Sequence, residues 1–149
     1  MLFRSRWKNL NRDVVYGQAW NPDGAAVAVV CLVHGLGEHS GRFEGVARAL
    51  TDAGVAVFAH DARGHGRTEG KCGDTPGYRY NLQDVTHLLE TAAQHHGDAP
   101  KFLYGHSMGG SQVLYHSLCR RRPLAGVIAT GPALRPAFEP PAWKTRLRS

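Results

Sequence analysis

Short apolar runs alternate along the chain with segments whose apolar residues recur every three or four positions. Residues 25–33 (AAVAVVCLV) form one continuous apolar run, and residues 55–59 and 124–130 form two more. Runs of this length are typical of strands that are buried on both faces of a parallel sheet. Residues 14–20 mix apolar and polar positions and predict an edge strand, and residues 101–104 predict a short strand.

Between these runs, the spacing of apolar residues predicts three helices, at residues 42–53, 80–95 and 108–121. Gly54 and Pro123 are natural ends for the first and the third helix. The side chains expected to face the core from these two helices are Phe43, Val46, Ala47, Leu50, Val113, Leu114 and Leu118. Strands and helices in alternation predict an α/β fold with a mostly parallel sheet and helices on both of its faces.

The composition indicates one globular domain and limits the kinds of partner that we expect. The 149 residues have the size of one domain, and 42% hydrophobic with 20% charged residues is typical of a globular chain. The net charge of +6 is spread over separate clusters, without a zinc-finger spacing or an RNA-binding pattern, so we expect no nucleic-acid partner. The three cysteines have no metal-binding spacing and the N-terminus resembles no signal peptide, which predicts a cytoplasmic protein without a metal or cofactor.

The strongest chemical signal is the sequence GHSMGG at residues 105–110, which fits the pattern G-x-S-x-G. It falls between a predicted strand and a predicted helix, where a nucleophile elbow exposes its serine on a sharp turn. Gly105 and Gly109 permit close strand–helix packing, and the amide of Met108 could hold an oxyanion. These residues predict a nucleophilic Ser107; the alternative is a tight turn without chemistry.

Two further strand ends should lie beside Ser107, because ligands bind outside the carboxyl ends of parallel strands. His34-Gly35-Leu36-Gly37 follows the first apolar run, and Leu36 is the expected second oxyanion donor; His34 alone could be a hydrogen-bonded strand-end histidine. Asp61 follows the second run and is interpreted as a structural residue that holds the next loop, the alternative being a triad acid. His65 is likewise interpreted as a local hydrogen-bonding residue rather than a base.

These motifs together resemble the monoacylglycerol lipase and lysophospholipase branch of the α/β-hydrolase family. The resemblance is carried by HGLGEHSGRF at 34–43, DARGHGRTEG at 61–70 and GHSMGG at 105–110. It implies a serine hydrolase that cleaves esters of monoacyl lipids without a cofactor. The positions that it assigns are the nucleophile Ser107, the oxyanion donors Leu36 and Met108, and the supporting residues His34, Gly35, Gly37, Gly105, His106 and Gly109. Ala62 and Arg63 depart from the polar residues that are usual in the second motif.

The order of a hydrolase triad is serine, then acid, then histidine. After Ser107 the sequence has no aspartate, and it has a single acid, Glu139, and a single histidine, His116. His116 should lie on the helix that follows the elbow and point away from it. The resemblance therefore implies that residues 1–149 are the N-terminal part of one α/β-hydrolase domain, with the lid starting at residues 134–149 and without the triad acid and base.

This reading predicts little or no activity for the chain alone, because a serine without a base is a weak nucleophile. Two alternatives stay open: a non-catalytic binding or scaffold protein, and a compact enzyme in which His65 and Asp61 form a dyad. The expected ligand is a small monoacyl lipid or ester. The basic tail at 140–149 could give weak membrane-surface contact, and an exposed edge at 124–130 could give self-association.

Overall fold

A computed structural model describes residues 2–9, 12–74, 77–120 and 122–134 of the chain. The predicted start of a lid at 134–149, with Glu139 and the basic tail, falls outside these residues except for residue 134. One six-stranded sheet runs through the described part, in the order β1-β2-β4-β3-β5-β6. Its strands are β1 (Leu2–Lys8), β2 (Val14–Trp20), β3 (Ala28–Val33), β4 (Val55–His60), β5 (Lys101–His106) and β6 (Gly126–Thr130).

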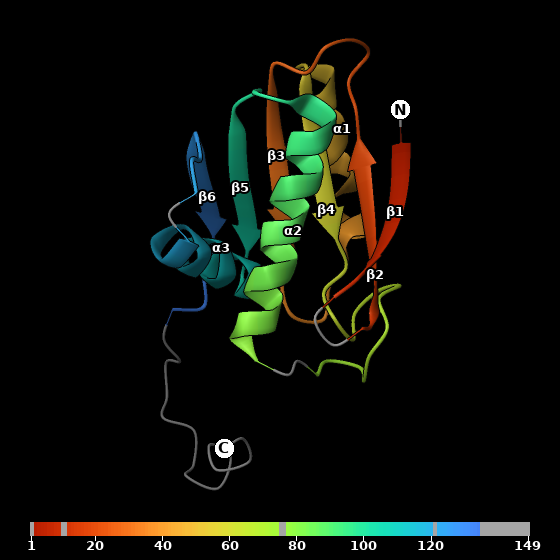
Figure 1. The fold of residues 1–149 in the computed structure, drawn as a ribbon, viewed down its shortest axis with the longest axis vertical. Helices are drawn as coiled ribbons and strands as arrows, with labels where there is room; N and C mark the ends of the chain where they lie inside the picture. Colours follow the sequence, from red (N-terminus) through yellow and green to blue (C-terminus); the bar gives the residue numbers. More distant parts are fainter. Residues whose placement is uncertain (1, 10–11, 75–76, 121, 135–149) are drawn as a thin grey trace, which may run out of the picture.

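The sheet is mixed and is covered on both faces. β3, β4, β5 and β6 pair in parallel, whereas β1 and β2 are antiparallel to their neighbours. Helix α1 (Glu44–Asp52), preceded by the short 3₁₀ helix η1 (Ser40–Phe43), lies behind the sheet in Figure 1, and α2 (Tyr78–His96) and α3 (Met108–Arg120) lie in front of it. The predicted α/β architecture, a mostly parallel sheet between two helical layers, is therefore confirmed. None of the helices in the described ranges is long and apolar enough to cross a bilayer.

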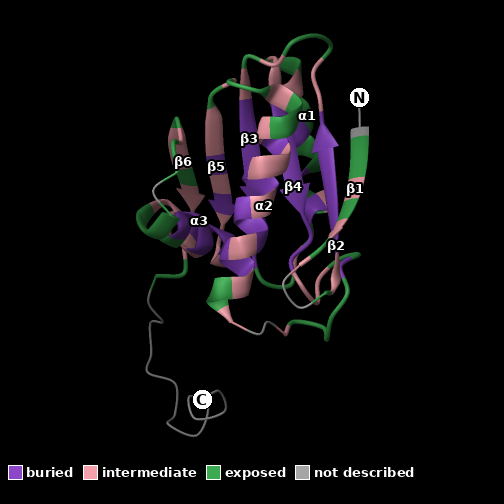
Figure 2. Ribbon diagram, in the orientation of Figure 1, coloured by how far each residue is buried: buried purple, intermediate pink, exposed green. Residues whose placement is uncertain are grey.

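Two hydrophobic cores follow from the alternation of side chains along β3. Val29, Cys31 and Val33 point to the α2 and α3 side, where they join Leu88 and Val113. The intervening residue Leu32 points to the α1 side and packs with Trp20, Phe43, Ala47, Val57 and Ala59. Figure 2 shows the central strands buried along most of their length. This double burial explains the continuous apolar sequence of β3 and β4, whereas residues 25–27 of the first run precede β3 and Val27 is 66% exposed.

The prediction that residues 14–20 form an edge strand is wrong. β2 pairs with β4 on one side and with β1 on the other, and β2 is buried from Val15 to Trp20. β1 takes the edge, and the apolar pattern did not reveal it because an edge strand with one solvated face needs few apolar residues. In the sequence, β1 shows only a basic side chain at every second position, at Arg4, Arg6 and Lys8.

The third apolar run is an edge strand, as expected, but its expected burial on both faces is wrong. β6 begins at Gly126 rather than at residue 124, its residues are only half-buried, and Ile128 is 47% exposed. Among the described residues only β5 pairs with it. Two helical side chains that were expected in the core are also exposed: Val46 on α1 and Leu118 on α3.

Candidate active site

Three parallel strands end at the same edge of the sheet, the lower edge in Figure 1, and each is followed by polar residues. His34 follows β3, Asp61 follows β4, and Ser107 follows β5. His34 and Asp61 are almost fully buried, whereas Ser107 is half-exposed. The residues that the sequence singled out are thus gathered on one edge, and Ser107 is the one among these three that solvent reaches.

Ser107 occupies a sharp turn between β5 and α3. Its φ of 54° lies in the left-handed region, which costs a non-glycine residue about 1–2 kcal/mol. Hydrogen bonds hold the turn on both sides: the amide of Ser107 donates to the carbonyl of Thr130 at 2.9 Å, and the amide of Ser111 donates to the carbonyl of Ser107 at 3.2 Å. A serine held in this conformation between a strand and a helix has the backbone geometry of a nucleophile elbow.

Glycines surround this turn because no side chain would fit. A Cβ on Gly105 would lie 2.3 Å from the carbonyl oxygen of Gly109, and a Cβ on Gly109 would lie 2.1 Å from the carbonyl oxygen of Val33. On the other side of the serine, a Cβ on Gly35 would lie 3.1 Å from the Cβ of Ser107. The three glycines therefore let α3, β3 and the loop after β3 approach the serine at backbone distance.

The loop after β3 makes a tight turn beside Ser107. The amide of Glu38 donates to the carbonyl of Gly35 at 3.3 Å, and Gly37 has a φ of +72°, as the third position of a type II turn requires. The Glu38 carboxylate accepts the amide of Gly35 at 3.0 Å and also pairs with Arg42 at 3.0 Å. This carboxylate clamps the turn at both ends and leaves Leu36 at its exposed tip.

Two backbone amides at the site have no hydrogen-bond acceptor among the described residues. One belongs to Leu36, at the tip of the turn, and the other to Met108, the first residue of α3. The first amides of a helix are unsatisfied within the helix and lie at its positive dipole end. Such a pair of amides beside a serine suits the stabilisation of a developing negative charge.

His34 holds the loop after β3 against the loop after β4. Its Nε2 accepts the amide of Ala62 at 2.9 Å, so Nδ1 carries the proton and donates to the carbonyl of Gly35 at 2.7 Å. Burial lowers the pKa of His34, and the carbonyl of Gly35 and the charge of Asp61 offset this only in part. A neutral histidine with both nitrogens engaged by backbone fixes two loops and has no free nitrogen for proton transfer.

Asp61 joins the same two loops through its carboxylate. Its Oδ1 accepts the amide and the hydroxyl of Ser40 at 2.7 and 2.6 Å, and its Oδ2 accepts the amide of Arg67 at 2.9 Å. His65, its partner in the alternative dyad, bonds instead to the carbonyl of Arg63 at 2.9 Å. These contacts commit Asp61 to Ser40 and Arg67, and they place no hydrogen bond between Asp61 and His65.

His116 lies in the interface between α2 and α3, fully buried, where its Nε2 meets Thr86 Oγ1 at 2.9 Å. Burial lowers the pKa of this imidazole to about 4, assisted by the charges of Arg120 and Arg122. It faces the core at a point nine residues along from Ser107 and serves packing between the helices. In the described part after Ser107, no acid–histidine pair accompanies the serine.

Three residues that sequence reasoning missed also shape the site. Thr130 receives the amide of Ser107 on its carbonyl and meets His106 Nδ1 with its hydroxyl at 3.0 Å, which ties the elbow to β6. Glu38 and Ser40 support the loop after β3, as described above. Glu38 had a local signal, because its partner Gly35 lies only three residues earlier in the sequence. Ser40 and Thr130 had none, because their partners come from distant strands.

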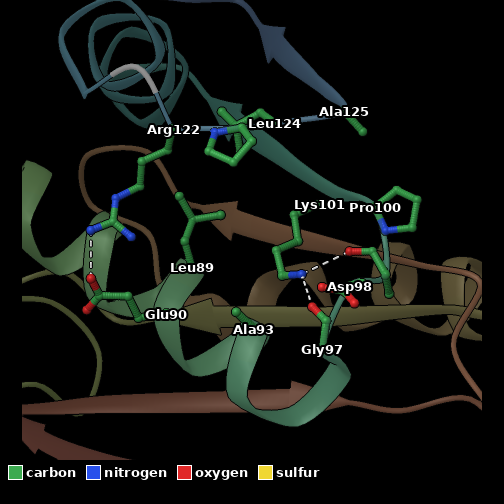
Figure 3. A pocket seen from close by; sticks show the side chains of 12 residues that line it. Leu89, Glu90, Ala93, Gly97, Asp98, Pro100, Lys101, Arg122, Leu124 and Ala125 are labelled. Carbon is green, nitrogen blue, oxygen red and sulfur yellow. Dashed lines mark hydrogen bonds and ion pairs between the residues drawn. The ribbon is translucent and has the colours of Figure 1, made fainter.

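A cavity of about 560 Å³ lies at the other end of the sheet (Figure 3). It is lined by the end of α2 and by the segments that lead into β5 and β6, among them Leu89, Lys101 and Leu124. Lys101 Nζ is bonded to backbone carbonyls, at 2.9 Å to that of Ala99, and Arg122 pairs with Glu90 at 2.7 Å on the rim. This cavity opens at the amino ends of the parallel strands and does not serve Ser107.

Comparison with known proteins agrees with this geometry. Residues 24–149 match the family described as serine aminopeptidase, S33. The chain belongs to this family of α/β-hydrolases. Human monoglyceride lipase is 34% identical over 124 residues, which cover 83% of this chain and 41% of that protein. The monoacylglycerol lipase of Mycolicibacterium smegmatis is 36% identical over 128 residues, covering 81% of this chain and 43% of the relative.

Solved structures of this hydrolase family superpose on the chain. A carboxyl esterase from Bacillus coagulans, in complex with glycerol, gives a TM-score of 0.79 at 30% identity over 86% of this chain and 43% of that one. The monoacylglycerol lipase of Paleococcus ferrophilus gives 0.76 at 33% identity over 87% of this chain and 48% of that one. The chain therefore spans less than half the length of these relatives.

Proposed function

We propose that this chain carries the nucleophile and oxyanion half of a serine ester hydrolase, with Ser107 as the nucleophile. The observation that carries the proposal is the left-handed Ser107 between β5 and α3, beside a glycine turn. In an acyl-transfer step, Ser107 Oγ gives its proton to a base and bonds to the ester carbonyl carbon, while the free amides of Leu36 and Met108 bind the carbonyl oxygen as it becomes negative. The tetrahedral intermediate then breaks its bond to the alcohol, which leaves with a proton, and the acyl group stays on Ser107. Loss of one such donor costs about 10²–10³ in rate in well-studied hydrolases.

The proposed substrate is a monoacyl lipid, a monoacylglycerol or a lysophospholipid, cleaved at its carboxylic ester bond. Support comes from the names of the relatives, which are monoglyceride lipases and a carboxyl esterase. The half-exposed Ser107 and the turn at Leu36 leave the serine open to an ester from solvent. We propose residues 1–149 as the N-terminal part of one hydrolase domain, whose lid starts at 134–149.

We further propose that these 149 residues alone turn over ester substrate poorly. His34 is engaged by backbone on both nitrogens, and His116 lies between two helices, so neither is free to take the proton of Ser107. A neutral serine hydroxyl is a weak nucleophile. A non-catalytic scaffold, the second candidate, has no observation of its own in its favour, whereas the elbow geometry favours the hydrolase.

A phosphonate probe that labels nucleophilic serines tests this function, with imidazole added as an external base. We expect weak labelling without imidazole, labelling that rises with imidazole concentration, and the label on Ser107 by mass spectrometry. Ser107→Ala should lose the label, whereas Ser111→Ala, a serine one turn further along α3, should keep it. Labelling of another residue, or none at saturating imidazole, would refute the assignment. Rapid ester turnover without imidazole that His65→Gln abolishes would favour the compact dyad instead.

A further inference from the structure

An arginine-rich hollow lies on the β1 flank of the sheet, away from the elbow. It has a volume of about 410 Å³ and is lined by Arg4, Ser5, Arg6, Tyr16 and Arg67. An adjoining hollow of similar volume shares Arg4, Tyr16 and Arg67 with it. The proposed hydrolase chemistry uses none of these residues, so the hollow needs an explanation of its own.

The register of the sheet brings the first two arginines together. Arg6 lies opposite Tyr16 and Arg4 lies opposite Gln18 on the neighbouring strand, and residues two apart share one face of a strand. Their Cα atoms are therefore about 7 Å apart, and both guanidinium groups rise from the face that also carries Tyr16. The alternation of side chains along β1 thus gathers two positive charges on one face.

Arg67 completes the group from the loop after β4. Its guanidinium carbon lies 4.9 Å from the centre of the Tyr16 ring, and its NH1 donates to the Tyr16 hydroxyl at 2.7 Å. The Tyr16 hydroxyl in turn donates to Gln18 Oε1 at 3.2 Å. Arg67 is held in place by this stacking and hydrogen bond, so ordering it costs little further entropy when a ligand binds.

The charge of these arginines is uncompensated within the described residues. Ion pairs with carboxylates hold other arginines of the chain, namely Arg42, Arg48, Arg63 and Arg122. No such pair is formed by Arg4, Arg6 or Arg67 in the ranges that the structure describes. Two acids line the adjoining hollow: Asp61 accepts hydrogen bonds from the amide and hydroxyl of Ser40 and from the amide of Arg67, and Glu44 is paired with Arg48 at 2.7 Å.

We propose that this hollow binds a phosphate group, as a free phosphate ester or as the headgroup of a lipid. Guanidinium groups bind phosphate oxygens through paired, charge-assisted hydrogen bonds, and the three exposed arginines that line this hollow offer such donors to one phosphate. The volume exceeds that of the phosphate alone and leaves space for the glycerol or alcohol that it esterifies. Repulsion among the three arginines is relieved when the anion binds, which favours an occupied site.

Titration calorimetry of the 149-residue chain with glycerol 3-phosphate tests the proposal. We expect saturable binding that Arg4→Gln with Arg6→Gln weakens by about tenfold or more, since each lost charge-assisted hydrogen bond costs about that factor. The matched control is Arg79→Gln with Arg120→Gln, which removes the same charge from α2 and α3 and should change the affinity less than twofold. Circular dichroism should show both double variants folded. If the β1 variant is unfolded, Arg67→Gln replaces it.

Vesicles distinguish the two sources of the phosphate. Phosphatidic acid vesicles that sediment the chain, in competition with glycerol 3-phosphate, would identify a lipid headgroup, whereas glycerol 3-phosphate binding without vesicle binding would identify a soluble ester. Absence of saturable binding, or equal weakening in the control variant, would overturn the proposal. Tighter binding to an oligonucleotide than to glycerol 3-phosphate, with the same arginine dependence, would also overturn it and identify nucleic acid. Ser107→Ala should leave all these affinities unchanged, which separates this site from the proposed hydrolase.

Discussion

At the scale of single residues, Ser107 stores backbone strain. Its φ of 54° is a conformation that glycine adopts freely and that alanine, like serine, adopts at a cost. Ser107→Gly and Ser107→Ala remove the same hydroxyl, so they differ mainly in this cost. We expect the glycine variant to have a free energy of unfolding about 1 kcal/mol higher than the alanine variant, measured by urea denaturation.

Ser111 supplies the matched control for this comparison. It lies within α3, where glycine is less favourable than alanine by about 1 kcal/mol, so the order of the two variants should reverse there. If glycine is less stable than alanine at both positions, Ser107 carries no strain and the elbow geometry is wrong. This test measures stability and needs no catalytic activity. Its result therefore does not depend on a catalytic base, which the described residues after Ser107 do not provide.

At the scale of elements, β6 leaves one side of the sheet without a partner strand among the described residues. Its backbone has no partner beyond β5 among the described residues, and Ile128 is 47% exposed. Such an edge pairs readily with another chain, and a lysine on it opposes this pairing. We propose that the 149-residue chain self-associates here, so its mass in sedimentation equilibrium should rise above 16.3 kDa with concentration. Ile128→Lys should abolish the rise.

The control for this edge is Leu118→Lys, which places the same charge on an apolar residue of α3 that is 77% exposed. It should leave the association intact. Equal loss in both variants would show that charge in general, rather than the β6 edge, sets the association. A mass that stays at 16.3 kDa over the whole concentration range would refute the proposal.

Some strands of the sheet could be predicted from the sequence and others could not. The buried strands β3 and β4 read clearly, because burial on both faces demands an unbroken apolar run. β1 did not, since seven ladder positions with β2 stabilise it through backbone hydrogen bonds that need no apolar side chain. Strand order was equally invisible, and so residues 14–20 were taken for the edge that β1 forms, whereas the edge at 124–130 was expected correctly. The elbow could be located because its glycines are required by close contacts at the turn, and these glycines lie close together in the sequence. The roles of Ser40 and Thr130 could not be predicted, because their hydrogen-bond partners come from distant strands.

At the scale of the whole molecule, buried titratable groups set the response to pH. Burial lowers the pKa of His60 to about 3 and that of His116 to about 4. Both imidazoles stay neutral in the folded state, so the unfolded state binds more protons below about pH 6.5 and stability falls on acidification. Asp84 acts in the opposite sense, because burial raises its pKa to about 6. Between about pH 4 and 6, the loss of stability that the two histidines cause on acidification is larger than the gain from the single carboxyl.

Asp84 can be isolated from this background by one substitution. The carboxyl is 3% exposed in α2, and the nearby indole N–H of Trp7 lowers its pKa but has no partner in hydrogen-bond geometry. The unfolded carboxyl ionises near 3.8 and the folded one near 6, so its contribution to stability is present below pH 3.8 and is lost as the pH rises to 6. Asp84→Asn removes this loss. Its gain in the free energy of unfolding over the natural chain should be larger at pH 8 than at pH 5 by about 1.4 kcal/mol.

Urea denaturation at these two pH values measures the difference, and the amide's own packing cancels because it is common to both. Asp98→Asn is the control, since Asp98 is an exposed aspartate in the turn after α2, and its effect should be the same at pH 5 and pH 8. A gain for Asp84→Asn that does not change with pH would show that the carboxyl is ionised throughout this range. The indole N–H of Trp7 would then have to stabilise the ionised Asp84 carboxylate, so that β1 and α2 would be joined through a carboxylate ion rather than a neutral acid.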